Sequence, residues 1–248
     1  MNFKRKNIIL AGLFCLVCTF LFSREKQIKC GIGFKAFEFA SHNNFIHSGK
    51  YLHGGFSYEF GNQFLHRVQF QVSNSNREIK LDIPYISAAT AANIYYDFVI
   101  QSISLKNSRH YFGLHIANDF NLNFFPKIDT RNLLWFNQSF TGISIMSKYK
   151  LNKNYNRIDF CTHIPIISTI LYNRLNRLTS EIPENSPIQS YSGLANKLFN
   201  ADAEIGYVFS KYGFSWGIYY QIELNIIHET ASNRLTGIAQ SASLRIIY

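Results

Sequence analysis

The chain has 248 residues, of which 16% are aromatic and 16% are charged, and its formal net charge is +10. Disordered chains combine few aromatics with high charge, so this composition excludes intrinsic disorder. Apolar residues make up 47%, yet the mean hydropathy is only −0.07. The sequence holds a single short apolar run, which excludes a bundle of membrane-spanning helices of about 20 residues each.

Residues 1–23 are typical of a secretory signal peptide. Residues 4–6, Lys-Arg-Lys, form a basic start, an apolar stretch covers residues 8–22, and Ser23 is a small residue at the exit. The apolar stretch is shorter than a spanning helix of about 20 residues, which favours a cleaved signal over an uncleaved anchor. Cleavage after Ser23 would remove three basic residues, lower the net charge from +10 to +7, and leave residues 24–248 as one domain.

The rest of the chain alternates between apolar and polar residues, as strands do when successive side chains point to opposite faces. In residues 197–210, for example, Ile205 and Tyr207 alternate with Asp202 and Glu204. We predict ten such strands, at residues 29–40, 50–60, 63–73, 93–105, 109–122, 133–149, 155–167, 197–210, 213–227 and 234–248. They exceed the usual length of about 5 or 6 residues in soluble sheets and suit tilted membrane crossings.

The predicted strands are joined by connections that are alternately short and long. The short ones are residues 61–62, 106–108, 150–154 and 211–212, and the long ones are 41–49, 74–92, 123–132, 168–196 and 228–233. Tight periplasmic turns and longer extracellular loops alternate in this way in bacterial outer-membrane barrels. The sequence therefore predicts an all-β fold, a transmembrane antiparallel up-and-down β-barrel of about ten strands (range eight to twelve). An even count leaves both termini on the periplasmic side.

One predicted strand, residues 133–149, breaks its own pattern. Ile143 and Ile145 take the face that Asn137 and Ser139 hold earlier in the strand. A β-bulge inserts one residue and so exchanges the two faces. We therefore expect a bulge near Gly142.

The last strand carries Ala242, Leu244, Ile246 and Tyr248 on one face. It resembles the terminal strand of Gram-negative outer-membrane barrels, whose final aromatic residue and alternating apolar positions are read by the barrel-assembly machinery. The resemblance implies an outer-membrane location, with lipids, lipopolysaccharide and that machinery as partners and with Leu244, Ile246 and Tyr248 as the assembly signal. The Asn- and Lys-rich composition is similar to that of Bacteroidetes-type barrels.

The catalytic motifs of the enzymes known among small outer-membrane barrels are not found in this sequence. Omptin-type proteases carry Asp-x-Asp and Asp-x-His pairs at the rim, and lipid A deacylases a His-x-Ser pair, none of which occurs here. The stretch from Gln71 to Ser75 resembles the His-x-Ser-Asn-Gly stretch of outer-membrane phospholipases. Gln71, however, stands in the place of the base, and a serine without a base is a poor nucleophile.

The polar positions of the strands predict a charged lumen. The residues predicted to point into it are Glu59, Arg67, Asp119, Asp159, Asp202, Glu204, Glu223 and Arg245, together with Arg157, His53, His115 and His163. Asp202, Glu204 and Glu223 could share a patch suited to acid–base work. The favoured interpretation is that opposite charges pair, because a desolvated lone charge is costly.

Metal and cysteine chemistry receive little support. The three histidines lie on three separate strands without the close spacing of a metal site, and we predict no metal and no cofactor. After removal of the signal only Cys30 and Cys161 remain; we expect both to be free.

Two classes of function stay open. The favoured one is a non-enzymatic structural or surface barrel, or a narrow porin-like channel with a charge-paired lumen; the alternative is a lipid-modifying hydrolase related to phospholipases or lipid A deacylases. Basic loop residues would either contact lipopolysaccharide phosphates or be simply solvated. These residues are Lys80, Lys127, Arg131, Arg174 and Arg177. No nucleic-acid module is present, so we expect no nucleic acid as a partner.

Overall fold

The structure is a computed structural model that describes residues 26–41, 46–80, 85–124, 133–151, 156–173, 188–194, 198–211, 214–230 and 233–248. The predicted signal peptide lies outside the described residues, as do Lys127, Arg131, Arg174 and Arg177. Every regular element in the described part is a strand. Within that part, no helix is long and apolar enough to cross a membrane.

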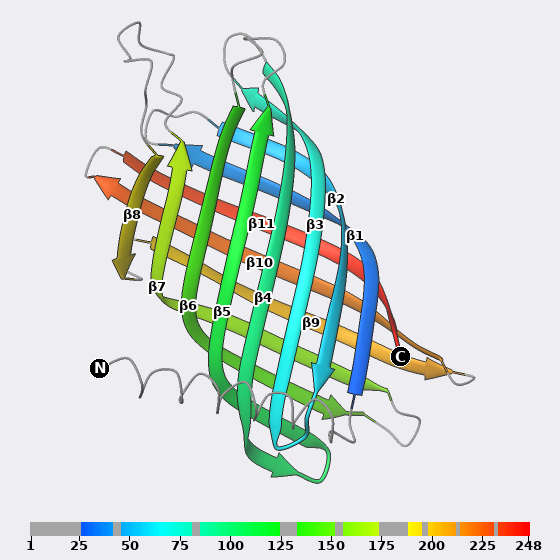
Figure 1. The fold of residues 1–248 in the computed structure, drawn as a ribbon. Coiled ribbons are helices and arrows are strands. Elements are labelled where there is room, and N and C mark those ends of the chain that lie inside the picture. Colours follow the sequence, from blue (N-terminus) through cyan, green and yellow to red (C-terminus); the bar gives the residue numbers. More distant parts are fainter. Residues whose placement is uncertain are drawn as a thin grey trace, which may run out of the picture.

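The strands form one closed antiparallel barrel (Figure 1). They are β1 (Lys26–Ser41), β2 (Ile46–Phe60), β3 (Phe64–Lys80), β4 (Tyr85–Leu105), β5 (Ser108–Phe124), β6 (Leu133–Lys150), β7 (Arg157–Asn173), β8 (Ile188–Leu194), β9 (Leu198–Lys211), β10 (Phe214–Thr230) and β11 (Asn233–Ile247). Each strand pairs with the next around the wall, and β11 returns to pair with β1 along thirteen registered positions, from Lys29↔Ile247 to Ser41↔Leu235.

Eleven strands make a ten-strand barrel because β8 and β9 share one position in the wall. β9 pairs with the first part of β7, from Arg157 to His163, whereas β8 pairs with its last part, from Ile167 to Asn173. The predicted all-β barrel of ten strands is therefore confirmed.

The strands extend further than predicted at the end with the long connections. β7 continues to Asn173 and β8 lies inside the segment 168–196 that the sequence predicts as a loop. Likewise β3 continues to Lys80, and β4, with 21 residues, begins at Tyr85. The alternation weakens there because polar and small residues occupy both faces, while backbone pairing does not depend on side-chain polarity. The predicted loops are accordingly too long.

The bulge near Gly142 belongs to the neighbouring strand. The β6–β7 ladder shifts register between Thr141 and Gly142, because Gly142 pairs with Pro165 and Thr141 with Ile167, which leaves Ile166 as the extra residue. The predicted bulge near Gly142 is therefore confirmed, although the extra residue lies on β7 and the inner face of β6 runs without interruption. Pro165 lacks the N–H that a regular ladder needs, which explains why β7 carries the irregularity.

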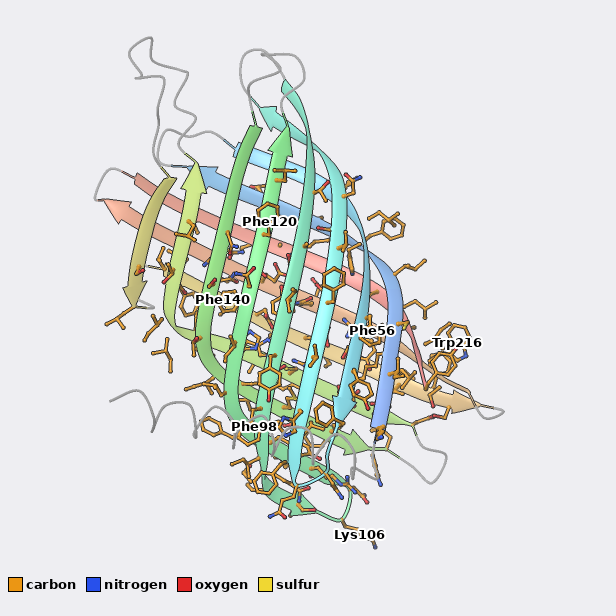
Figure 2. The ribbon with its side chains drawn as sticks, in the orientation of Figure 1. Phe56, Phe98, Lys106, Phe120, Phe140 and Trp216 are labelled. Atoms are coloured by element: carbon orange, nitrogen blue, oxygen red, sulfur yellow. The ribbon has the colours of Figure 1, made fainter. Side chains whose placement is uncertain are left out.

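The two faces of the wall have opposite character. Apolar side chains such as Ile32 (68% exposed) and Phe34 (73%) cover the outside, and Phe56, labelled in Figure 2, belongs to this set. The inside is lined by buried polar and charged residues together with a cluster of buried apolar side chains. Cys30 is exposed and Cys161 is buried, and both are free, as predicted.

The two ends of the described barrel meet at the rim that carries the tight turns. Ile28 and Tyr248 exchange two backbone hydrogen bonds of 3.0 and 2.9 Å, and Lys26 pairs with Phe60 just before the turn at Gly61. Gly61 has a φ of 99°, a conformation that L side chains rarely adopt, so glycine is needed there. Residues 26 and 248 therefore lie at the same end of the barrel, as an even number of barrel positions requires.

Candidate functional site

Charged side chains cross the lumen near the tight-turn end. Lys29 on β1 donates to Glu59 Oε1 at 2.7 Å and to Asp159 Oδ2 on β7 at 3.4 Å. Lys148 on β6 donates to the other oxygen of Glu59 at 2.5 Å. Since β1 and β2 lie opposite β6 and β7 in the wall, this cluster joins the two sides of the barrel. Arg157 adds a pair to Asp159 at 2.8 Å.

A second cluster occupies the middle of the lumen around Asp97, whose side chain is fully buried. Arg67 Nε donates to Asp97 Oδ2 at 2.7 Å. His115 Nδ1 donates to Asp97 Oδ1, also at 2.7 Å. The ring of His115 stacks on that of His163 with centroids 3.8 Å apart, so the cluster spans β3, β4, β5 and β7.

Cys161, His163 and Asp202 complete this middle cluster. His163 Nδ1 lies 2.8 Å from Asp202 Oδ1, and its Nε2 lies 3.3 Å from Cys161 Sγ. The guanidinium of Arg67 donates to both Cys161 Sγ, at 3.1 Å, and His163 Nε2, at 2.8 Å. His163 Nε2 also lies 3.2 Å from Asp97 Oδ1, so this nitrogen is in contact with a guanidinium, a thiol and a carboxylate.

A third set of pairs lies on the wall formed by β1, β9, β10 and β11. Arg245 binds Glu204 through both of its terminal nitrogens, and its guanidinium lies 4.1 Å from the ring centroid of Tyr219. Lys35 donates to Glu223 at 2.5 Å. These contacts combine an arginine–carboxylate fork with a cation–π contact.

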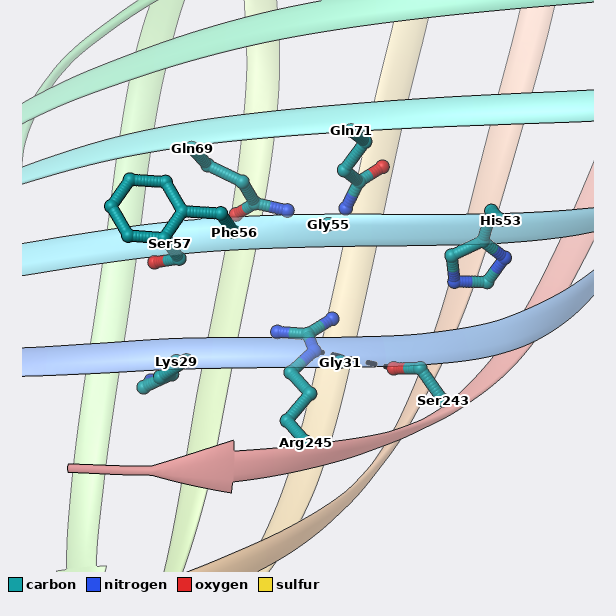
Figure 3. Close-up of a pocket in the computed structure, with 10 residues that line it drawn as sticks. All are labelled: Lys29, Gly31, His53, Gly55, Phe56, Ser57, Gln69, Gln71, Ser243 and Arg245. Atoms are coloured by element: carbon teal, nitrogen blue, oxygen red, sulfur yellow. Dashed lines mark hydrogen bonds between the residues drawn. The ribbon is translucent and has the colours of Figure 1, made fainter.

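The structure places each predicted lumen residue as follows. Glu59, Arg67, Asp159, Asp202, Glu204 and Arg245 are buried, and Asp119 and Glu223 are half-buried. Asn200 donates to Asp119 at 3.5 Å. His53 lies away from the other two histidines, beside Arg245 and Ser243 (Figure 3).

The three carboxylates that could form one acidic patch each have a positively charged or imidazole partner of their own. Asp202 contacts His163, Glu204 binds Arg245, and Glu223 accepts from Lys35. Asp202 and Glu223 are direct register partners on β9 and β10, so the expected proximity exists. The pairing favours a structural role for these groups over acid–base catalysis.

Several residues of the site escaped the sequence reasoning. Asp97, Lys29, Lys148 and Cys161 hold its central contacts, and none was singled out as a candidate. Asp97 shares the inner face of β4 with Tyr95 and Val99, so the period-two pattern carried a signal for it. The contacts themselves join strands that are far apart in the chain, and no local pattern encodes them.

The proposed assembly-signal residues lie on the outside of the last strand. Leu244 is 46% exposed and Tyr248 is 66% exposed, and Ile246 is half-buried. All three face away from the lumen. Their role as a signal remains a prediction.

Two small cavities lie among these side chains. Within the described part of the lumen, a cavity of about 20 Å³ lies beside Lys29, His53 and Arg245 (Figure 3), and another of about 10 Å³ lies beside Cys161 and His163. One water needs roughly 10–15 Å³ of such volume. Each cavity is therefore the size of about one water molecule.

Known proteins resemble this chain in structure only. No protein-family profile and no curated protein matches the sequence. The outer membrane protease OmpT from Escherichia coli is similar with a TM-score of 0.56 at 6% identity, covering 92% of this chain and 97% of that one. The β domain of the Bordetella autotransporter BrkA has a TM-score of 0.40 at 7% identity over 90% and 99% of the two chains. The translocator domain of NalP from Neisseria meningitidis has a TM-score of 0.37 at 5% identity over 97% and 96%.

Proposed function

We propose that this chain, which has the fold of the Gram-negative outer-membrane β-barrels, is a closed structural or surface barrel of the outer membrane and not a channel. Its apolar outer face suits contact with lipid, and its lumen is filled by paired charges. Outer-membrane lipids and lipopolysaccharide are then its surroundings, and the tight-turn end with both termini faces the periplasm.

One observation carries the proposal: side chains from opposite walls touch directly. Lys29 on β1 reaches Asp159 on β7, Lys148 on β6 reaches Glu59 on β2, and Arg67 on β3 reaches His163 on β7. A conducting path would have to break these contacts and leave buried charges without partners, which costs several kcal/mol for each ion. The water-sized cavities beside them support the same conclusion.

Conductance of the purified, refolded protein in a planar lipid bilayer tests this proposal. We expect no stable single-channel steps for the unaltered chain. A triple variant, Lys29→Ala, Glu59→Ala and Lys148→Ala, removes three charges of the cluster near the tight-turn end. It leaves Asp159 paired with Arg157 and should introduce measurable conductance. Steady channels in the unaltered protein would contradict the proposal.

A hydrolase is the competing function, and the same preparation addresses it. The closed barrel should release no fatty acid from phospholipid or lipid A. If it does, and if Asp202→Asn abolishes the release while heat-modifiable gel mobility stays intact, the lumen carboxylates act in catalysis. Otherwise substitutions at Asp202, Glu204 and Glu223 should affect folding only.

A further inference from the structure

A furrow crosses strands β4 to β7 on the outer face of the wall, where these strands lie side by side (Figure 1). Its volume is about 310 Å³. β6 forms its floor, because Ser139 and Thr141 are small and Ile116 and Ile167 rise on either side of Thr141. Two neighbouring rows of register partners line the furrow, Ile94↔Asn118↔Ser139↔Thr169 and Tyr96↔Ile116↔Thr141↔Ile167.

One of the two rows is polar although it lies inside the apolar surface of the barrel. Asn118 stands between Ile116 and Phe120 on the outer face of β5, and these two apolar side chains are 44% and 37% exposed. On β7, Ile167 and Leu171 enclose a polar position in the same way, at 53% and 39%. In hydrocarbon a polar group without a hydrogen-bond partner is costly. The polar row therefore needs partners that a plain hydrocarbon chain does not supply.

The hydrogen bonds among these side chains leave an acceptor and two donors unused. Asn118 donates both of its amide protons, to Asn137 Oδ1 at 2.6 Å and to Ser139 Oγ at 2.8 Å. Among the described residues no donor reaches Asn118 Oδ1, and the Ser139 hydroxyl, which already accepts, keeps its own proton for another partner. The hydroxyls of Thr169 and Ser192 contact each other at 2.9 Å. Since each has one proton, this pair also has one left to donate.

We propose that the furrow binds an acyl chain that carries a hydroxyl or secondary amide group, as part of a membrane lipid. The chain would lie along the apolar side chains of Tyr96, Ile116 and Ile167, and its polar group would meet Asn118 Oδ1 and the Ser139 hydroxyl. A hydroxyl or a secondary amide both donates and accepts, as this pair of atoms requires, whereas an ester only accepts. Such binding rests on the proposed function, because it needs the outer face of the barrel to contact lipid.

The lining favours this occupant over a lipid headgroup or a second barrel. No charged side chain lines the furrow in the described part of the wall, so nothing there matches a phosphate. A second barrel would present a broad convex wall that rests on Ile94 and Ile167 and bridges the floor at Ser139 and Thr141. A single chain is narrow enough to reach that floor. The volume of the furrow also lies at the lower end of the range for small-ligand sites, about 300–1,000 Å³.

Binding of two matched probes to the full chain, refolded in detergent micelles, tests the site. The probes are 3-hydroxytetradecanoate and tetradecanoate, which differ by one hydroxyl. Native mass spectrometry counts the bound molecules, and a titration gives the affinity for each probe. We expect one bound chain per barrel and an affinity about three- to tenfold higher for the hydroxylated probe, as one net hydrogen bond supplies. This ratio is compared between variants, so that unequal partition of the two probes into micelles cancels.

Matched variants assign the binding to the furrow. The double variant Asn118→Leu with Ser139→Ala removes the acceptor and the donor, and should abolish the preference for the hydroxylated probe while tetradecanoate still binds. Thr141→Phe places a large side chain on the floor and should abolish saturable binding of both probes. Thr236→Ala removes a hydroxyl on β11, outside the furrow, and as the control should leave both affinities unchanged. Heat-modifiable gel mobility establishes that each variant is folded.

An unchanged preference in the double variant, or saturable binding that survives Thr141→Phe, would overturn the proposal. Ser139→Cys in a Cys30→Ser background should stay monomeric in lipid vesicles under oxidising conditions; a disulfide-linked dimer would instead place a second barrel over the furrow. Conductance tests the closed barrel separately. A conducting protein that prefers the hydroxylated probe would keep this site and lose the proposed function, and a silent barrel without that preference would lose this site alone.

Discussion

Lys29 and Asp159 are 130 positions apart in the sequence, yet Lys29 Nζ lies 3.4 Å from Asp159 Oδ2 inside the barrel. The contact joins β1 to β7, which are not neighbours in the wall. Glu59 completes the bridge, since it accepts from both Lys29 and Lys148. The lumen is thus held by contacts across its width as well as by the backbone ladders of the wall.

Replacing the central carboxylate of this bridge should destabilise the barrel. Glu59→Gln leaves Lys29 and Lys148 buried with reduced compensation, and breaking a buried pair typically costs about 3–5 kcal/mol. Urea unfolding in lipid vesicles measures the loss. Glu38→Gln, at an exposed position of β1, is the control and should change the free energy of unfolding by less than about 0.5 kcal/mol. Equal effects of the two substitutions would contradict the argument.

The pair between Arg245 and Glu204 offers a complementary comparison. Arg245→Met leaves the buried Glu204 carboxylate without its main partner and should cost about 3 kcal/mol or more. The double variant Arg245→Met with Glu204→Leu removes both charges and should recover most of that loss, because apolar replacement of a whole buried pair is often neutral. No recovery in the double variant would mean that packing against Tyr219, not charge pairing, dominates here.

The position of the Tyr219 ring requires glycine at position 206 on the neighbouring strand, β9. Its ring lies over Gly206, where an added Cβ would collide with ring atoms Cδ1 and Cε1, and its hydroxyl donates to Asp159 at 3.1 Å. Gly206→Ala should therefore displace the ring and destabilise the barrel by about 1–3 kcal/mol. Gly54→Ala is the control, because an added Cβ there would find its nearest neighbour at an ordinary contact distance of 3.8 Å. Comparable losses at the two glycines, measured by denaturant unfolding, would rule out the ring as the cause.

The outer face can be tested at Ile218, the fifth residue of β10, which is 57% exposed. In a lipid bilayer, Ile218→Arg should cost up to about 2–4 kcal/mol, the range for arginine on the lipid face of a barrel, which is largest near the midplane. Vesicle-based unfolding measures this, with Ile218→Val as the matched control. A protein that stays folded without detergent, and becomes more soluble on Ile218→Arg, would show that this face meets water.

The last residue separates folding from assembly. Tyr248→Ala should lower the amount of barrel inserted in the outer membrane of cells several-fold, because the terminal aromatic is the expected signal for the assembly machinery. Refolding of the same variant into detergent should be nearly unchanged, since Tyr248 is 66% exposed and adds little packing. Tyr220→Ala, another outward tyrosine at 40% exposure, is the control. Unchanged insertion of Tyr248→Ala would remove the proposed signal.

The period-two pattern by itself determined the class of fold, the number of barrel positions and the face on which most side chains lie. That success has a simple cause: lipid outside and polar groups inside impose opposite demands on successive residues. The pattern was less informative where both faces are polar, as in the outer parts of β3 and β4, and there the predicted strands were too short. At Gly142 it predicted an irregularity in β6, and the β6–β7 ladder does shift register there, with the extra residue on β7 beside Pro165.

Only the tertiary structure decided which lumen charges meet. Local alternation establishes that Arg67, His115, Cys161 and His163 point inward, but not that they converge with Asp97. Barrel closure and strand register set those distances, and both are properties of the whole sheet. The same chain of pairings brought two of the three predicted histidines together and left His53 elsewhere. The sequence thus determined which side chains point into the lumen, and the closed sheet determined which of them are in contact.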